Sequence, residues 1–261
     1  MNSRQYNRDS QAKIQDSLYE YPYHYLPRLQ GTDFSQHRFW SWGYRYLGRL
    51  QVTFDLLGRI EFDSLLDIGC GDGRFLREAS LLLDGKRMAG IDKSPRAISL
   101  ARQLNPEIEF EARDILENPP SEKWDAISML EVIEHIPPSS LSDFLATAAG
   151  ALNPGGHLLL TVPHLNEKQA DKHYQHFNST MLERLLRPDF SNIQCIPFDN
   201  ISLLMRLTGK LLGGSGKFFM VTHQGLNNLR FRYYLRKCLY PAKEGNCRRL
   251  ACLARKQDRE Q

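Results

Sequence analysis

Two carboxylates and an imidazole lie close together in the segment EVIEHIPP, residues 131–138. In one turn of helix, Glu131, Glu134 and His135 would share a face, because residues three and four apart are neighbours on a helix surface. Such a group could bind a divalent metal, since carboxylate oxygens and a neutral imidazole nitrogen are good ligands, or it could supply a general base. An ordinary solvated helix end is the third interpretation. The segments that surround 131–138 must decide among these three interpretations.

The composition is that of a protein that buries a core. Of the 261 residues, 41% are hydrophobic and 25% charged, and the mean hydropathy is −0.47. These values exclude disorder throughout, and no run approaches the roughly 18 apolar residues of a membrane-spanning helix. The N-terminal segment lacks the apolar stretch of a signal peptide. We therefore expect a cytoplasmic location, with peripheral contact to a membrane as a further option.

Charge is distributed unevenly along the chain. The net charge is +4, yet the residues from Arg206 onward contain thirteen lysines and arginines against three acids. Such a segment either meets an anionic partner or is a solvated cationic surface. The five cysteines include no C-x-x-C pair, so we expect reduced thiols and neither a disulfide framework nor a zinc site.

Strand-like and helix-like segments alternate through the middle of the chain. Short apolar runs indicate strands, and apolar residues at helical spacing indicate helices. The predicted strands are 64–69, 87–92, 108–110, 125–130 and 157–163, and the predicted helices are 74–83, 94–104 and 141–152. This alternation predicts a parallel sheet with right-handed crossovers.

The remaining segments complete the predicted organisation. A helix at 179–186 is followed by strands at 192–198 and 248–256. We expect three parts. They are a helical N-terminal cap at 1–60, a core at 61–198 and 248–258, and a substrate-binding insertion at 199–247, before the last strand.

A glycine loop, DIGCGDG, joins the first predicted strand to the first predicted helix. Gly69, Gly71 and Gly73 let the backbone turn tightly and let a ligand approach it closely. A dinucleotide site would have its third glycine at position 74, where Arg74 stands, and no P-loop motif is present. The loop therefore argues against NAD, FAD and a P-loop nucleotide.

From Leu65 to Pro163 the chain resembles the class I S-adenosylmethionine-dependent methyltransferases. LLDIGCGDG is similar to their first motif, WDAISMLEVIEHI to their fourth, and LNPGGHLLLTVP to the turn and strand that follow it. The resemblance implies an α/β fold: a Rossmann-like, doubly wound, mostly parallel sheet of seven strands. It also implies S-adenosyl-L-methionine as cofactor and S-adenosyl-L-homocysteine as product.

The resemblance implies a set of cofactor-binding residues. In that family the acid at Asp67 orients the methionine part, Asp92 accepts both ribose hydroxyls and Asp114 takes the adenine amino group. Any one of these acids could be a strand-end residue without a ligand, but their joint order and spacing favour the site. The implied residues are Asp67, Gly69, Cys70, Gly71, Asp92, Lys93, Asp114, Ile115, Leu130 and Glu131.

The EVIEHIPP segment gains further interpretations from the resemblance. E-x-x-E-H, together with the run H-Y-x-H-F at 173–177, is common in the subset that includes ubiquinone-type O-methyltransferases. In small-RNA 3′-end 2′-O-methyltransferases, E-x-x-E-H and a downstream histidine, here His173 or His176, bind a divalent metal. We expect Glu131 to line the methionine pocket and His135 to face the acceptor as the catalytic base. No metal is assigned, although a metal site and a purely structural role stay open.

The function implied is methyl transfer to an oxygen of a small-molecule or lipid-linked acceptor. Oxygen is favoured because the motifs are similar to the O-methylating subset and no N-P-P-Y-type motif is present. One alternative is an RNA methyltransferase that uses the basic C-terminal region, although nucleic acid is the less favoured partner. Another is a catalytically idle cofactor-binding partner protein.

Two runs of the insertion suggest contact with an anionic surface. SLLMRLTGKLLGG at 202–214 is rich in leucine, and LRFRYYLRK at 229–237 interleaves basic and aromatic residues. The basic and aromatic run could bind RNA, a phosphorylated sugar or an anionic membrane surface, or it could be a helix with one packed aromatic face and one solvated basic face. The leucine-rich run could enter lipid, cover an apolar acceptor or be buried within the insertion. The oligomeric state is not indicated by any of these features.

Overall fold

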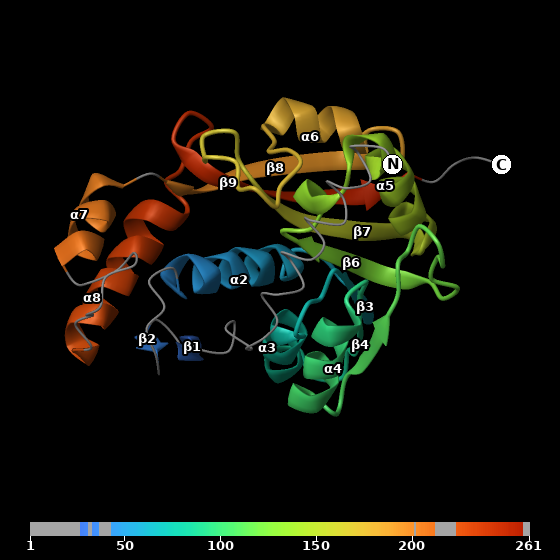
Figure 1. Ribbon diagram of the computed structural model, residues 1–261, viewed down its shortest axis with the longest axis horizontal. Helices are drawn as coiled ribbons and strands as arrows, with labels where there is room; N and C mark the ends of the chain where they lie inside the picture. The colour runs from blue at the N-terminus through green and yellow to red at the C-terminus, as the bar shows by residue number, and fades with distance from the viewer. Residues whose placement is uncertain (1–26, 31–32, 37–42, 201, 212–222, 258–261) are drawn as a thin grey trace.

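A seven-stranded sheet forms the centre of the computed structural model, which describes residues 27–30, 33–36, 43–200, 202–211 and 223–257 (Figure 1). The strands of this sheet are β3 (Ser64–Ile68), β4 (Arg87–Asp92), β5 (Glu109–Ala112), β6 (Trp124–Leu130), β7 (Leu152–Pro163), β8 (Phe190–Asn200) and β9 (Cys247–Lys256). Their order is β5-β4-β3-β6-β7-β9-β8. Strands β3 to β7 pair in parallel, and β9 runs antiparallel between β7 and β8. The predicted seven-stranded, mostly parallel sheet is confirmed.

Helices cover both faces of this sheet. The helices of the described residues are α2 (Gly43–Leu57), α3 (Arg74–Leu82), α4 (Pro95–Leu104), α5 (Leu141–Gly150), α6 (Ser179–Leu186), α7 (Leu203–Leu211) and α8 (Gln224–Tyr234). Two of them, α7 and α8, lie at one end of the molecule, apart from the sheet (Figure 1). Buried residues of α5 and α6 share one apolar cluster with the sheet. Buried residues of α2, α3, α4 and α8 belong to a second cluster. The two clusters are the two layers of a doubly wound α/β fold.

The predicted core elements agree closely with the observed ones. The strand at 87–92 and the helix at 179–186 have the predicted bounds. The hydroxyl of Ser94 caps α4 by accepting a hydrogen bond from the N–H of Ala97 at 3.2 Å. Strand β7 begins earlier than predicted, because Leu152 pairs with Trp124 on β6 before the register shifts. The N-P-G-G turn is therefore included within the strand.

The N-terminal region differs from the predicted helical cap. Within the described residues, α2 is the expected helix, but β1 (Pro27–Gln30) and β2 (Asp33–Gln36) form an antiparallel hairpin. Gln30 pairs with Asp33 at one end of the register, and Pro27 pairs with Gln36 at the other. Residues 1–26 lie outside the described part. The division of the chain into three parts stays a prediction.

The insertion packs against α2 through aromatic residues. Tyr44 on α2 stacks on Phe231 of α8, with ring centroids 5.8 Å apart. Gly48 on α2 lies under Tyr234 of α8, and a Cβ at Gly48 would be 2.7 Å from Cε1 of that ring. Helix α8 continues into a π-helical turn at Leu235–Leu239. The absent side chain at position 48 therefore lets the two helices approach closely.

Replacing Gly48 by alanine tests this close approach. Tyr234 is 2% exposed, so its ring has little room to move, and we expect Gly48→Ala to lower the free energy of unfolding by about 1–3 kcal/mol. The matched control is Gly150→Ala at the end of α5, where a Cβ would meet nothing within 4 Å. That change should be neutral or stabilise by up to about 1 kcal/mol. Urea unfolding of both variants measures the difference.

Candidate functional site

The glycine loop after β3 has the backbone geometry that its sequence predicts. Gly69, Gly71 and Gly73 have φ angles of 76°, 57° and 77°, in the left-handed region that favours glycine. A Cβ at Gly69 would be 2.5 Å from Cγ2 of Val132. The loop is fixed to β4 because the N–H groups of residues 69 and 70 donate to the carbonyl of Ile91 at 2.7 and 3.1 Å.

The carboxylate of Asp92 contacts both the glycine loop and the loop that follows β4. Its Oδ2 accepts a hydrogen bond from the N–H of Gly71 at 3.0 Å, and its Oδ1 accepts one from the N–H of Ser94 at 2.8 Å. Asp92 is the last residue of β4, so it stands at the carboxyl edge of the sheet, where ligands of such folds bind. The structure thus brings Asp92 and the glycine loop together, as the sequence predicts.

Asp67 lies beneath this edge, within β3, and is 2% exposed. Its Oδ1 accepts a hydrogen bond from the hydroxyl of Ser128 on β6 at 2.6 Å. Burial raises the pKa of Asp67 to about 7, with a further contribution from the nearby charge of Asp92. A cationic ligand group at this position would favour the ionised carboxylate. The ammonium and sulfonium groups of S-adenosylmethionine fit that requirement.

The other predicted cofactor residues lie on the same part of the sheet. Cys70 is buried and its thiol pKa is raised well above the usual value by burial and by Asp92. Asp114, after β5, accepts a hydrogen bond from the N–H of Leu116 at 3.0 Å, and Ile115 is buried. Lys93 is exposed and Leu130, at the end of β6, is half-buried. A cofactor role for each of these residues stays a prediction.

Glu131 is held by two arginines that sequence reasoning did not find. Its φ is 59°, and its Oε2 lies 2.9 Å from Nε of Arg249 on β9 and 3.2 Å from Nη1 of Arg49 on α2. Burial by itself raises the pKa of Glu131, but Arg249 and Arg49 outweigh it and hold the pKa below its usual value. Arg49 and Arg249 carry no motif that would have identified them.

The E-x-x-E-H segment is not the single helical face that its spacing predicts. Residues Ile133–His135 form one turn of 3-10 helix, and Glu131 precedes it in the left-handed region. As a result Glu131 is paired with arginines, whereas Glu134 and His135 meet a histidine from further along the chain. The prediction that all three residues share one face is wrong for Glu131.

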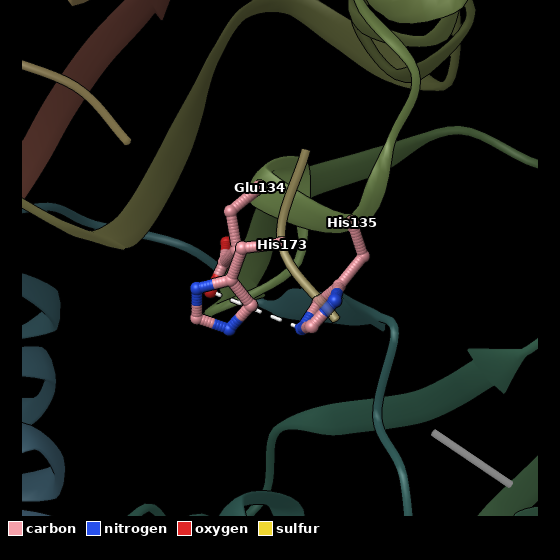
Figure 2. A group of neighbouring side chains, drawn as sticks. All are labelled: Glu134, His135 and His173. Atoms are coloured by element: carbon pink, nitrogen blue, oxygen red, sulfur yellow. Dashed lines mark ion pairs between the residues drawn. The ribbon is translucent and has the colours of Figure 1, made fainter. Parts of the chain in front are cut away.

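Glu134, His135 and His173 converge on one point (Figure 2). One ligand atom from each lies within 4.8 Å of the other two, and Oε1 of Glu134 is 4.0 Å from Nε2 of His135. Among the described residues, these are the ones brought together in a way that suits a metal ion. Oε2 of Glu134 is buried and has no hydrogen-bond partner within the described part of the chain. Of the two downstream histidines, the structure brings His173 into this group.

Backbone carbonyls fix the tautomers of the histidines. A carbonyl only accepts, so Nδ1 of His135, 3.0 Å from the carbonyl of Lys172, carries the proton. In the same way Nδ1 of His176 donates to the carbonyl of Glu167 at 3.2 Å. Nε2 of neutral His176 then accepts from Nδ1 of His173 at 2.9 Å. Both His135 and His173 consequently keep Nε2 as a bare lone pair.

Burial shifts the pKa of each member of this group toward its uncharged form. It lowers the pKa of His135 to about 4, helped by Lys172, and that of His173 to about 3, helped by His135. Burial also raises the pKa of Glu134 well above its usual value, with a contribution from Glu131. The pKa of His135 therefore lies below the usual imidazole value, because its ring is largely removed from water.

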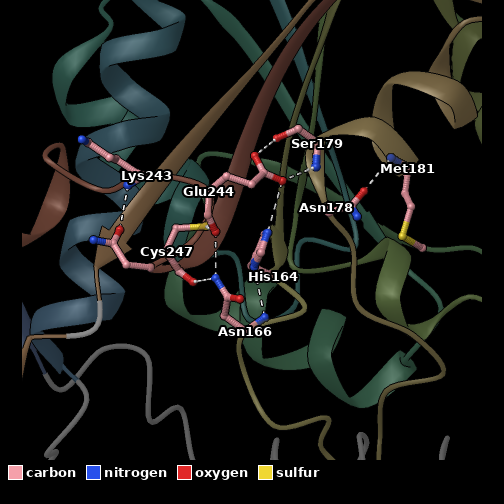
Figure 3. Close-up of polar contacts among 9 residues, drawn as sticks. His164, Asn166, Asn178, Ser179, Met181, Lys243, Glu244 and Cys247 are labelled. Carbon is pink, nitrogen blue, oxygen red and sulfur yellow. Dashed lines mark hydrogen bonds and ion pairs between the residues drawn. The ribbon is translucent and has the colours of Figure 1, made fainter.

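His164, a further histidine after β7, connects two segments of the chain through its ring nitrogens. Its Nε2 lies 3.3 Å from Oε1 of Glu244, and its Nδ1 accepts a hydrogen bond from the N–H of Asn166 at 3.0 Å (Figure 3). Glu244 also accepts from the N–H of Ser179 at 2.9 Å. These contacts join the loop after β7 to the segment before β9, and they use both ring nitrogens of His164.

Comparison with known proteins identifies the family. A family model described as a methyltransferase domain matches residues 38–209, more than half of the chain. The chain belongs to the class I S-adenosylmethionine-dependent methyltransferases. S-adenosyl-L-methionine is the cofactor of this family, and the glycine loop, Asp67 and Asp92 fit it. The expected family, fold and cofactor are confirmed.

Individual relatives match part of this methyltransferase. The ubiquinone biosynthesis O-methyltransferase of Alkalilimnicola ehrlichii is 32% identical over 126 residues, 46% of this chain and 49% of that protein. The protein of the same name from Pseudomonas putida strain W619 is 35% identical over 111 residues, 40% and 46% of the two chains. The methyltransferase thus spans about half the length of the curated relatives it matches.

Solved structures share the fold at lower identity. N-methyltransferase NodS from Bradyrhizobium japonicum WM9, solved in complex with S-adenosyl-L-homocysteine, superposes with a TM-score of 0.53 at 19% identity. The match covers 82% of this chain and 88% of that one. Among the helices described in this methyltransferase, none has the length and hydropathy needed to span a membrane.

Removal of the Asp92 carboxylate tests the cofactor site. We expect Asp92→Ala to weaken binding of S-adenosyl-L-homocysteine by about tenfold to a hundredfold, because hydrogen bonds to a charged group are lost. Asp92→Asn keeps the shape and should show a smaller loss. Asp84→Ala, at an exposed acid after α3, is the matched control. Unchanged affinity in both Asp92 variants by titration calorimetry would contradict the assignment.

The titration of His135 tests the buried neutral group. In the folded protein the ring should take up its proton near pH 4, whereas in urea it should do so near 6.5. Below about pH 6.5 the unfolded chain therefore binds a proton that the folded chain does not. This histidine thus makes stability fall as the pH drops from about 6.5 towards 4. Nitrogen-15 chemical shifts of the ring measure both midpoints, and a folded midpoint near 6.5 would show that the ring is solvated.

Proposed function

We propose that this protein methylates a hydroxyl oxygen of a small-molecule or lipid-linked acceptor. The observation that carries the proposal is the pair of neutral imidazoles, His135 and His173, which present bare Nε2 atoms beside the edge that carries Asp92. Bare nitrogens can accept the proton of a hydroxyl and orient its oxygen. The relatives that match over this region are named as O-methyltransferases, which supports oxygen as the acceptor atom.

The residues divide the work between two ends of the site. S-adenosyl-L-methionine, when bound, supplies an electrophilic methyl group. Asp92 and the glycine loop would hold the adenosine, and Asp67 would face the cationic methionine part. Methyl transfer needs mainly alignment of the two reactants, and such positioning is worth several kcal/mol in enzymes. A site built largely from fixed backbone and buried acids suits that requirement.

His135 suits the late removal of a proton. A base whose pKa is about 4 takes little from a resting hydroxyl, but the oxygen becomes strongly acidic as it gains the methyl group. A nearby neutral nitrogen can accept the proton at that stage. The hydrogen bond from Nδ1 to the carbonyl of Lys172 fixes the ring orientation and would stabilise the charged form once it has formed.

A second role for the same residues is metal-assisted O-methylation. Ligand atoms of Glu134, His135 and His173 lie within 4.8 Å of one another, and neutral imidazole is the form that binds metals. A divalent ion held there would also favour the ionised form of buried Glu134. Oxygen atoms of an acceptor could complete the coordination.

Transfer of labelled methyl groups tests the function. We expect purified protein and radiolabelled S-adenosyl-L-methionine to label hydroxyl-bearing small molecules or lipids in a fractionated cell extract. Label in RNA would support the alternative of an RNA methyltransferase, and cofactor binding without label in any fraction would support an idle binding protein. His135→Gln should lower the rate at least tenfold. His157→Gln, in the middle of β7, is the control.

Chelation separates the two roles of the histidines. If Glu134, His135 and His173 hold a metal, a chelator should abolish turnover and added Mg²⁺ or Zn²⁺ should restore it. If His135 acts as a base without a metal, turnover should continue unchanged in chelator. Cofactor binding, measured in the same samples, should be unaffected in either case, since Asp92 and the loop use no metal.

A further inference from the structure

Helix α7 exposes a continuous face of leucine. Leu203, Leu204, Leu207 and Leu211 are 66%, 48%, 49% and 74% exposed. At 100° per residue these four positions span an arc of about 100° on one side of the helix. We call this set the leucine face. Isolated exposed leucines are common in soluble proteins, but four on a single short helix form a patch of the kind that marks an interaction site.

The opposite side of α7 anchors the helix to the protein. Met205 packs against the apolar cluster beneath α8. Arg230 of α8 donates to the carbonyl of Met205 and to the hydroxyl of Thr208, both at 3.1 Å. Gly209 lies against the same guanidinium group, 3.0 Å from the position of a Cβ. With that side occupied, the leucine face is turned away from the molecule, at the end where α7 and α8 stand apart from the sheet (Figure 1).

The surroundings of the leucine face are cationic. From Asn200 to Lys243 the sequence has eight lysines and arginines and no acidic residue. Exposed members described in the structure include Arg206 on α7 and Arg236 and Lys237 after α8. Leu229, which is 67% exposed, adds an apolar side chain on α8. A partner that fits must therefore be both apolar and negatively charged.

We infer that the α7–α8 end of the protein binds the surface of an anionic lipid bilayer. The leucine face would enter the boundary between headgroups and acyl chains, as the apolar side of an interfacial helix does. The flanking arginines and lysines would lie at the level of the anionic headgroups, whose potential attracts basic residues. Neither element spans the bilayer. This inference does not rest on the proposed acceptor, since it uses only residues of the insertion.

A bilayer explains the pattern better than a second copy of the chain. Two copies meeting through this end would bring like charges together, because the acid-free segment supplies no carboxylate to pair with the arginines. An anionic membrane offers an apolar layer below a negative one, in the order that leucine and arginine require. Charge and apolar area therefore point to the same occupant.

Vesicle binding by the full chain tests the inference. We expect sedimentation with vesicles of phosphatidylcholine and phosphatidylglycerol at least about tenfold stronger than with phosphatidylcholine alone, and weaker at high salt. Leu203→Ser with Leu207→Ser should reduce binding to the anionic vesicles by about tenfold or more. Arg206→Glu with Arg236→Glu should remove the preference for phosphatidylglycerol.

A matched control separates this face from exposed leucine in general. Leu81 and Leu82 on α3 are 71% and 61% exposed, and replacing both by serine should leave vesicle binding unchanged. Circular dichroism and S-adenosyl-L-homocysteine binding show that each variant is folded. Equal binding of neutral and anionic vesicles, or binding that survives the α7 changes, overturns the inference. The inference is also overturned if the wild-type protein binds no vesicle and instead forms a dimer that dissociates when Leu203 and Leu207 are both replaced by serine.

Discussion

The ion pairs of Glu131 with Arg49 and Arg249 hold three separate parts of the molecule in one arrangement. Arg49 belongs to α2, Arg249 to β9, and Glu131 to the exit of β6. Their side chains are largely buried, so the loss of one partner leaves a charge uncompensated, which typically costs about 3–5 kcal/mol. The left-handed backbone at Glu131 is a further strain that these contacts must offset. The position of Glu134 and His135, just beyond, depends on this arrangement.

Two different kinds of charge control operate at the two ends of the site. At the cofactor end, acids lie under or beside a glycine loop in which the N–H of Gly71 donates a hydrogen bond to Asp92. At the proposed acceptor end, burial raises the pKa of Glu134 and leaves the imidazoles neutral, and carbonyl groups set which nitrogen is bare. The positively charged cofactor and the uncharged hydroxyl that we propose as acceptor make opposite demands on their surroundings. The two ends of this site meet those demands separately.

Much of the fold could be predicted because its signals are local. The alternation of apolar runs with helical periodicity located nearly every strand and helix of the core, and the glycine loop located the cofactor edge. The hairpin β1–β2 was missed because four-residue strands carry too short a pattern to separate from helix. The bounds of β7 were missed because pairing with β6 overrode the turn signal of N-P-G-G.

Only part of the site could be predicted, because several of its contacts join residues that are far apart in the sequence. Asp92 ends β4 and Gly71 lies in the loop after β3, so their meeting is a consequence of topology. Arg49 and Arg249 meet Glu131 across long sequence separations, and nothing local marks them. The bare nitrogen of His135 depends on a main-chain carbonyl at Lys172, which no side-chain pattern records. Burial also shifted the histidine pKa values, and burial is a property of the folded chain.

Helix α2 contacts both helix α8 and Glu131 at the exit of β6. Tyr44 and Gly48 contact α8, and Arg49, at the next position, contacts Glu131. Because adjacent positions on a helix rise only about 1.5 Å, these contacts belong to one stiff unit. Any rocking of the insertion must therefore carry Arg49 with it and disturb the turn before His135. Helix α2 therefore couples the position of α8 to the position of the turn that carries His135.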